Sequence, residues 1–287
     1  QWLFDGHPVG ADQPLHVAVA RLLGYKWPRQ TGASFPDCPA LDLDGLEKLA
    51  DDDGIVCISA VRGEQPASER LLELLQASYG ANWNNALVDK LLVAAGNKPG
   101  TMLEDWLRNA FFEQHTKLFH NRPFIWNIWD GRKDGFSCLV NYHKLDHKAF
   151  ENLTYSYLGD WITIQKNDAA ANRPGADLRL KAAQELQEKL KLIINGAPPY
   201  DIFVRWKPLS QQAIGWHPDL NDGVRMNIRP FVEAGVLRKN PNIKWTKDRG
   251  KEPNRPADQY PWFWKDGEFT GERVNDVHLT NEQKAPK

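Results

Sequence analysis

The stretch Pro123–Tyr142, PFIWNIWDGRKDGFSCLVNY, decides the fold of this 287-residue chain. Two runs rich in β-branched and aromatic residues, PFIWNIWD and FSCLVNY, surround a short connection that contains Gly131 and Gly135. Two such runs around a glycine-containing turn predict an antiparallel hairpin. A further strand is expected at Ile55–Ala60, a short apolar run that follows Gly54.

Helices are expected upstream of the hairpin. Apolar residues at helical spacing predict them at Leu15–Leu23, at Leu71–Tyr79 and at Met102–His120. Thr101 and Glu104 match the T-x-x-E pattern of a capping box, which places the start of the third helix just after Thr101. The N-terminal part of the chain is therefore predicted to be rich in helix.

Two more helices are expected downstream. Asp146 is predicted to cap a helix that ends at Gly159, and 167–177 is predicted to be a loop. Asp177 is predicted to cap a helix that ends at Asn195. The inward face of that helix is expected to carry Ala183, Leu186, Leu190, Ile193 and Ile194.

Helices and antiparallel strands without a regular βαβ alternation predict an α+β fold. We expect helices packed on short, mostly antiparallel sheets, followed by an irregular C-terminal segment rich in Pro, Trp and Arg. The chain is divided into a helix-rich part, residues 1–121, and a mixed α+β part with the basic C-terminal segment, residues 122–287. The two parts are also compatible with one compact module.

The composition, 41% hydrophobic and 25% charged residues, is that of a globular protein. No apolar run approaches the roughly 20 residues that span a bilayer, and QWLFDGHPVG at the start does not resemble a signal peptide. The three cysteines, Cys38, Cys57 and Cys138, lie far apart, which favours reduced thiols. We therefore predict a cytoplasmic protein without a membrane partner.

Because the chain opens with Gln1 instead of Met, we expect a piece of a longer polypeptide.

The sequence lacks the G-x-G-x-x-G, G-x-S-x-G and P-loop motifs of common enzyme sites. His143 and His147 are four residues apart, but no H-E-x-x-H motif or Cys/His cluster accompanies them. APPY at Ala197–Tyr200 differs from the N-P-P-Y motif of amino-methyltransferases, because Ala197 has no side-chain acceptor. Its prolines instead stop the preceding helix. We predict no catalytic residue, no metal site and no cofactor in this chain.

The net charge of −1 hides an asymmetry, since residues 1–172 are acidic and residues 173–287 are basic. Gly223–Arg255 contains nine cations and three carboxylates. Cations contact phosphates and an exposed Trp stacks on an unpaired base, so this segment suits DNA. The predicted DNA-contacting residues are Arg225, Arg229, Arg238, Lys239, Lys244, Trp245, Lys247, Arg249 and Lys251. A solvated surface loop is the alternative.

Several ordered blocks together resemble one family: HNRPFIWNIWDGRKDGFSCLVNYHKLDHKAFENLTYSYLGDWI, PPYDIFVRWKPL, GWHPDLNDGVRMNIRPF and GVLRKNPNIKW. They resemble the far C-terminal region of large AdoMet-dependent N6-adenine DNA methyltransferases of phage defence. These are the BREX and DISARM methylases and relatives of type IIG restriction–modification enzymes. The family pattern matches Arg122-Pro123, Trp126, Gly131, Leu139-Val140, Tyr142-His143-Lys144 and Asp222–Asn227. The likeness covers roughly residues 50–280.

The resemblance implies that the AdoMet-binding motif and the N-P-P-Y/F motif lie upstream of Gln1. The parent protein would flip an adenine out of the duplex and methylate it at N6. This chain would be a non-catalytic module, inactive alone, that contacts double-stranded DNA or braces the recognition domain. Its partners would include the upstream methyltransferase domain and other subunits of the defence system.

Two other functions stay open. The chain could be a protein-interaction module that docks on the methyltransferase half or on another defence subunit through an apolar patch. It could also be a free-standing carbohydrate-active enzyme, with Trp126, Trp129, Trp161, Trp206 and Trp216 lining a sugar cleft. The third reading requires a deep pocket with two carboxylates at glycosidase separation. Most of these Trp residues lie in apolar runs, so a place in the core is expected for them.

Overall fold

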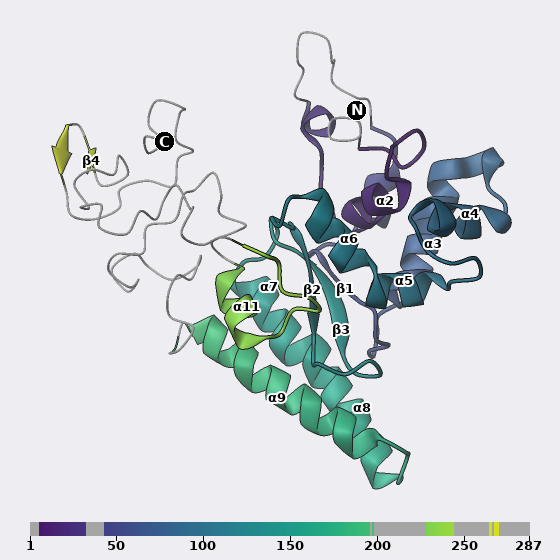
Figure 1. Ribbon diagram of the computed structural model, residues 1–287. Coiled ribbons are helices and arrows are strands. Elements are labelled where there is room, and N and C mark those ends of the chain that lie inside the picture. The colour runs from purple at the N-terminus through teal and green to yellow at the C-terminus, as the bar shows by residue number, and fades with distance from the viewer. Residues whose placement is uncertain are drawn as a thin grey trace.

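The computed structural model describes residues 6–32, 43–195, 197, 228–243, 264–265 and 267–269. Within them, helices surround a small antiparallel sheet, which confirms the predicted α+β class (Figure 1). The irregular C-terminal segment lies largely outside the described residues. The block Asp222–Asn227 lies wholly outside them.

The predicted hairpin is confirmed as β2, Ile125–Trp129, and β3, Ser137–Asn141. The carboxylate of Asp130 closes the connection by accepting a hydrogen bond of 2.8 Å from the backbone N–H of Phe136. A Cβ at Gly135 would collide with that carboxylate. The hairpin therefore needs glycine at this position to let the Asp130 side chain cross the turn.

A third strand, β1, Ile55–Cys57, joins the hairpin from far earlier in the chain. It pairs antiparallel with β3, which gives the strand order β1-β3-β2. The expected strand Ile55–Ala60 is therefore confirmed in its first half only. The ladder ends because the N–H groups of Ile58 and Ser59 both donate to the carbonyl oxygen of Ser137, at 2.8 and 3.2 Å.

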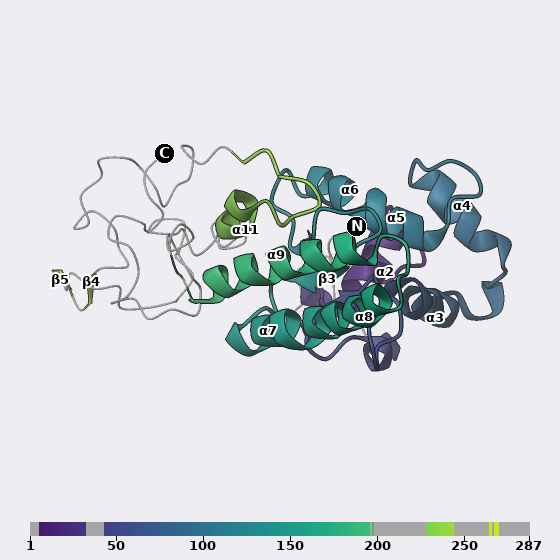
Figure 2. The same ribbon diagram turned by 90° about the horizontal axis from the view of Figure 1, so that it is seen from below.

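Helices lie on both sides of this sheet (Figure 2). The α-helices of the described residues are α2 Pro14–Leu22, α3 Ala67–Tyr79, α4 Ala86–Ala94, α5 Leu103–Asn109, α6 Phe111–Leu118, α7 His147–Glu151, α8 Leu158–Ala170, α9 Ala176–Asn195 and α11 Arg229–Ala234. Figure 2 shows α5 and α6 on one side of the sheet and α7 and α8 on the other. α9 packs along α8 and also contacts α11. Within the described ranges, no helix is long and apolar enough to cross a bilayer.

The remaining elements are short. They are the 3-10 turns η1 Pro28–Thr31, η2 Leu46–Leu49 and η3 Gly80–Asn82, the π-helix η4 Asn152–Tyr157, and the strands β4 Trp264–Lys265 and β5 Glu268–Phe269. β4 and β5 pair antiparallel with each other.

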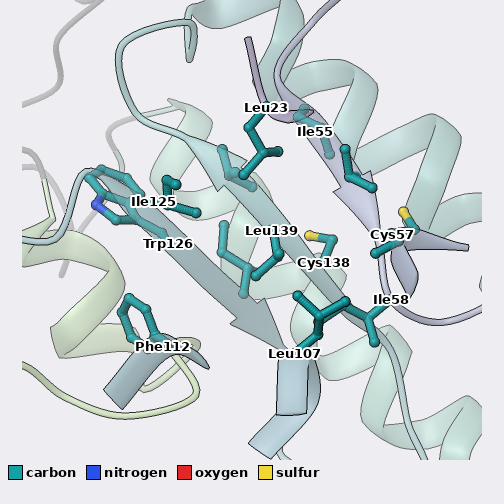
Figure 3. Close-up of a cluster of buried hydrophobic side chains, with 14 of the residues drawn as sticks. Leu23, Ile55, Cys57, Ile58, Leu107, Phe112, Ile125, Trp126, Cys138 and Leu139 are labelled. Carbon is teal, nitrogen blue, oxygen red and sulfur yellow. The ribbon is translucent and has the colours of Figure 1, made fainter. Parts of the chain in front are cut away.

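One hydrophobic core fills the space around the sheet (Figure 3). It joins Leu23, Ile55 and Leu107 to Trp126 and Leu139, so it takes side chains from both sides of the expected boundary at residues 121 and 122. The division into 1–121 and 122–287 stays a prediction. Trp126 is fully buried, as expected for a Trp in an apolar run.

The expected helix Met102–His120 is wrong as a single helix. It is divided into α5 and α6 at Ala110, whose φ of −119° departs from helical geometry. The capping box is wrong too, because the N-cap is Met102 and makes no side-chain cap hydrogen bond. The hydroxyl of Thr101 donates instead to the carbonyl oxygen of Lys98, at 2.7 Å, within the preceding turn.

Asp146 caps α7 as predicted, and its side chain accepts a hydrogen bond of 2.7 Å from the N–H of Ala149. The expected end at Gly159 is wrong, because α7 continues through η4 into α8. Gly159 is therefore inside a helix, and its carbonyl oxygen accepts a hydrogen bond of 2.9 Å from the Thr163 hydroxyl. The expected loop at 167–177 is correspondingly shorter, since α8 runs to Ala170.

The predicted inward face of α9 is confirmed at all five positions: Ala183, Leu186, Leu190, Ile193 and Ile194 are buried. The helix begins at Ala176, so Asp177 lies in its first turn instead of capping it. A carboxylate there still opposes the positive end of the helix dipole.

Candidate functional site

The structure describes three of the predicted DNA-contacting residues, Arg229, Arg238 and Lys239. The others lie outside the described residues: Arg225, Lys244, Trp245, Lys247, Arg249 and Lys251. Arg229 is in the first turn of α11, and its Nε donates to Oε1 of Glu233 at 2.7 Å. Arg238 and Lys239 lie in the segment after α11, which runs beside β2.

Arg238 is held against β2 by aromatic and polar contacts. Trp129 Nε1 donates to the carbonyl oxygen of Leu237 at 2.9 Å, and the Arg238 guanidinium carbon lies 4.1 Å from the centre of a Trp129 ring. Nη2 of Arg238 donates to Oδ1 of Asn109 at 2.6 Å. Burial, and then the nearby charge of Arg108, lower the pKa of Arg238. The guanidinium still stays protonated at neutral pH.

Lys239 reaches across to α6. Its Nζ lies 2.5 Å from Oε1 of Glu113, which also forms an ion pair of 2.9 Å with Lys117. Hydrogen bonds from Lys239 and Lys117 lower the pKa of the Glu113 carboxyl. One carboxylate thus stands between two exposed ammonium groups.

Together Arg108, Lys117, Arg238 and Lys239 form what we call the α6 basic surface. Arg238 contacts a neutral ring and a neutral amide, so its positive charge is not cancelled by those contacts. Among the described residues, the two lysines share the acid Glu113, and Arg108 forms an ion pair of 3.2 Å with Glu104. Cations of this kind contact phosphate oxygens, and such contacts carry no information on the base sequence.

A second polar cluster lies where the chain enters β1. The Asp51 side chain is buried, and its Oδ1 accepts hydrogen bonds from the N–H groups of Asp53, Gly54 and Ile55, at 2.7 to 3.1 Å. Its Oδ2 accepts a hydrogen bond of 2.7 Å from Arg70. Burial acts to raise the pKa of Asp51, but its contacts with Asp53 and Arg70 outweigh burial and leave it lowered.

Asp53 connects this cluster to the π-helix η4. Its Oδ2 accepts hydrogen bonds from Asn152 Nδ2 at 2.7 Å and from the Tyr157 hydroxyl at 3.1 Å. Residues five apart are neighbours on successive turns of a π-helix, so η4 brings both donors to one carboxylate. Burial, followed by the neighbouring Asp51 carboxylate, raises the pKa of Asp53 to about 6.

Two cavities flank this acidic cluster, of about 790 Å³ toward Asp146 and about 540 Å³ toward Glu64. Both are lined by Asp53, but its oxygens and those of Asp51 already accept hydrogen bonds that hold the backbone and η4 in place. Asp51 and Asp53 are therefore not the two available carboxylates that the hydrolysis of sugars needs.

Lys144, part of the family block Tyr142-His143-Lys144, has a structural position next to this cluster. Its Nζ donates to the carbonyl oxygens of Asp51 and Asp52, at 2.6 and 3.2 Å. A side chain on Gly24 or Gly54 would collide with Lys144, and both glycines have positive φ, +70° and +77°. Lys144 thus joins the end of the hairpin to the segment that enters β1.

The histidines do not form a metal site within the described part of the chain. No group of three or more His, Cys, Asp or Glu side chains there is placed to hold a metal ion. His147 Nδ1 instead lies 3.3 Å from the carboxylate of Glu151, one turn further along α7.

Sequence reasoning missed the cluster of Asp51, Asp53 and Lys144. The run Asp51-Asp52-Asp53-Gly54 in front of an apolar strand was the available signal, since side-chain carboxylates often accept hydrogen bonds from nearby backbone N–H groups at such turns. Asn152 and Tyr157 gave no signal, because their convergence depends on the π-helix.

A search against protein-family models found no match for this chain. Over 190 residues, the chain is 23% identical to the adenine-specific methyltransferase PglX of Lacticaseibacillus casei (strain Zhang). The match covers 64% of this chain and 15% of the PglX protein. The likeness supports a role related to that of an adenine-specific methyltransferase.

Proposed function

We propose that this chain is a non-catalytic, DNA-contacting C-terminal module of an AdoMet-dependent N6-adenine DNA methyltransferase that serves bacterial anti-phage defence or restriction–modification. The observation that carries the proposal is the likeness to an adenine-specific methyltransferase over 64% of the chain. The match spans 15% of the relative. Our proposal assigns AdoMet binding and methyl transfer to other parts of the parent protein. The location of such an enzyme would be cytoplasmic.

The α6 basic surface supports contact with the DNA backbone. Arg238 keeps its charge while Trp129 and Asn109 fix its position. Its side chain would therefore lose little conformational entropy on binding a phosphate. Further cations follow Lys239 in the sequence, at Lys244, Lys247 and Arg249. Contacts of this kind bind duplexes without regard to sequence and place the module on the helix.

Duplex binding as a function of salt tests the proposal. We expect the chain to bind a fluorescein-labelled 30-base-pair duplex at low salt, with an affinity that falls steeply as salt rises, because phosphate contacts release counterions. The variant Lys244→Glu/Lys247→Glu/Arg249→Glu should bind at least about tenfold more weakly, and its salt slope should be smaller by about 1 for each lost contact. Fluorescence anisotropy measures both quantities.

The matched control reverses three exposed lysines of α8 and α9 instead: Lys166→Glu/Lys181→Glu/Lys189→Glu. It changes the net charge by the same amount, so a general charge effect would weaken both variants equally. Equal loss in both, binding that does not respond to salt, or no binding at low salt would each contradict the proposed DNA contact.

A further inference from the structure

A groove of about 800 Å³ lies between α3, α4 and the start of α5, on the opposite side of the sheet from α11 (Figure 1). Its apolar lining includes Leu72 of α3, Trp83 just before α4, Val88 of α4, and Met102 at the N-cap of α5. The first three are half-buried, whereas Met102 is 67% exposed. An exposed methionine and a half-buried Trp in one groove make an adaptable apolar surface.

The rim of this groove is acidic. Glu69, Asp89, Glu104 and Asp105 line it, and none of its described lining residues is Lys or Arg. Asp89 accepts a hydrogen bond of 2.8 Å from the N–H of Gly100, and Glu104 forms an ion pair of 3.2 Å with Arg108. Within the described residues, the exposed carboxylates of Glu69 and Asp105 have no such partner.

We propose that this groove binds a cationic amphipathic segment of a protein partner. Apolar side chains of the segment would pack on Trp83 and Met102, while its Lys or Arg side chains would pair with Glu69 and Asp105. Binding of a helix by its apolar face in a groove is a common mode of peptide recognition, and complementary charge sets the register. The acidic rim repels nucleic acid, so charge points to protein as the occupant of this face.

This proposal does not depend on the proposed DNA contact. The α6 basic surface and the acid-rimmed groove use different residues, although they meet at the ion pair between Arg108 and Glu104. If both functions hold, the module binds DNA and a protein through separate side chains. Failure of peptide binding would leave the DNA result unchanged, and the reverse is also true.

Peptides of defined charge test the groove. The probe is a labelled 18-residue amphipathic helix with Leu and Trp on one face and Lys on the other. A peptide with Glu in place of every Lys and a scrambled Lys peptide serve as comparisons. We expect saturable binding of the Lys helix only, with weakening at high salt. Fluorescence anisotropy gives the Kd, and hydrogen exchange should show added protection in 68–76 and 83–105.

Two variants probe the two halves of the groove. Glu69→Lys/Asp105→Lys should weaken binding of the Lys helix about tenfold, since each pair lost is also replaced by repulsion. Met102→Asp should weaken it by a similar factor, about tenfold, by placing a charge on the apolar contact. Thermal unfolding of each variant verifies that the fold is retained.

Matched controls lie on α8 and α9. Asp160→Lys/Glu185→Lys reverses two acids away from the groove, and Leu178→Asp alters a side chain that is 58% exposed. Both controls should bind the Lys helix as the unchanged chain does. The proposal is overturned if the Lys helix does not bind, if the groove variants bind it as well as the controls do, or if duplex DNA competes for the same groove.

Discussion

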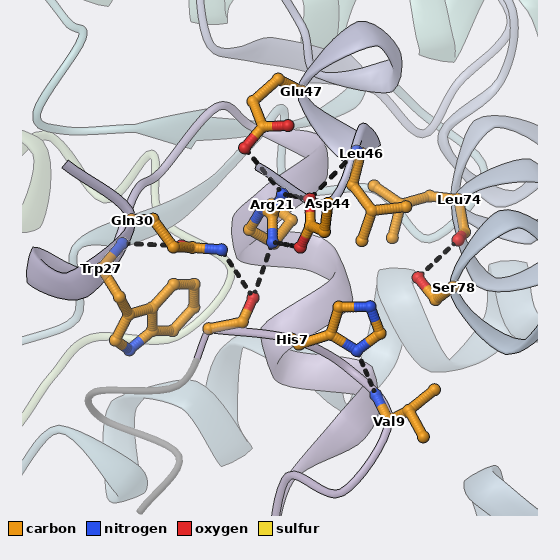
Figure 4. A network of polar contacts seen from close by, with 11 residues as sticks. His7, Val9, Arg21, Trp27, Gln30, Asp44, Leu46, Glu47, Leu74 and Ser78 are labelled. Atoms are coloured by element: carbon orange, nitrogen blue, oxygen red, sulfur yellow. Dashed lines mark hydrogen bonds and ion pairs between the residues drawn. The ribbon is translucent and has the colours of Figure 1, made fainter. Parts of the chain in front are cut away.

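Helix α2 buries two basic side chains, His16 and Arg21, in opposite ways. Arg21 is 2% exposed, and Asp44 forms a bidentate pair with its guanidinium at 2.7 and 2.8 Å (Figure 4). The Gly6 carbonyl oxygen accepts a third hydrogen bond of 2.9 Å, and Glu47 lies 3.3 Å away. Burial acts to raise the pKa of Asp44, but Arg21 outweighs burial and leaves it lowered.

His16 is 3% exposed and stays neutral instead. Its ring stacks on Phe111 with centroids 5.1 Å apart and lies 6.0 Å from the ring of His115. Its Nε2 lies 3.3 Å from Oε1 of Gln114. Burial lowers the pKa of His16 to about 4, against the opposing effect of Gln114.

The second histidine behaves in the same way. His115 Nε2 accepts a hydrogen bond of 3.1 Å from the N–H of Ile125, so the proton of the neutral ring is on Nδ1. Burial, and then His16, lower the pKa of His115 well below its usual range. The guanidinium of Arg21 is thus buried beside carboxylates and a carbonyl, whereas the two imidazoles, whose ordinary pKa is close to neutral, are buried among aromatic rings and lose their protons.

The largest expected effect comes from breaking the charged end of α2. Arg21→Met should lower the free energy of unfolding by about 3–5 kcal/mol, because it removes the cation that pairs with the Asp44 carboxylate and leaves the Gly6 carbonyl with only the 3.3 Å hydrogen bond from Gln30. Arg173→Met is the control, since Arg173 is 68% exposed in its pair with Asp168 and should cost about 1 kcal/mol or less. Urea unfolding at pH 7 measures both. Similar losses in the two variants would mean that the buried Arg21–Asp44 pair contributes no more to stability than the exposed Arg173–Asp168 pair.

Burial of neutral His16 among aromatic rings should make the free energy of unfolding fall at acidic pH. The folded pKa of His16 is below the unfolded value, so its contribution to stability is complete above pH 6.5 and is lost as pH falls toward 4. The loss from His16 amounts to about 3 kcal/mol at 1.36 kcal/mol per pKa unit, and His115 adds to it. His16→Phe should keep most of the stability at pH 7 and reduce this loss.

Urea unfolding at a series of pH values measures the loss, with exposed His147→Gln as the control. If the His16→Phe curve runs parallel to that of the unchanged chain between pH 6.5 and 4, the neutral state assigned to His16 is wrong.

The smallest effect is expected at Asp53, where the sign is reversed. Its pKa of about 6 is above the unfolded value, so the contribution from its protonated form is present at low pH and is lost as pH rises through 6. Asp53→Asn should therefore reduce the fall in the free energy of unfolding that accompanies a rise in pH through 6. At pH 7 it should change that free energy by about 1 kcal/mol or less. Asp52→Asn, at an exposed neighbour, is the control. An unchanged pH profile in Asp53→Asn would place the titration on another group.

Sequence patterns predicted the parts of the fold that depend on local chemistry. The hairpin followed from two β runs around glycines, and the inward face of α9 followed from helical spacing. The break at Ala110 and the π-helix at Asn152–Tyr157 gave no local pattern. They depend on contacts between distant segments, such as those of Asn152 and Tyr157 with Asp53.

The candidate surfaces divide in the same way. Positive charge in the sequence marked Arg238 and Lys239, but it did not show that Trp129 and Glu113 would contact them. The acid-rimmed groove was missed because its residues come from three separate segments, around Leu72, Trp83 and Met102. Only packing of the helices brings those segments to one surface.

The strand order β1-β3-β2 has a consequence for dissecting the chain. β3 is the central strand, so a fragment that starts at residue 122 would keep the hairpin but leave one side of β3 as an open edge. That edge would present the backbone groups of Cys138 to Val140 between buried apolar side chains, a template for aggregation. A soluble C-terminal piece therefore has to begin ahead of Ile55, or to receive residues 55–57 from a second, complementing fragment.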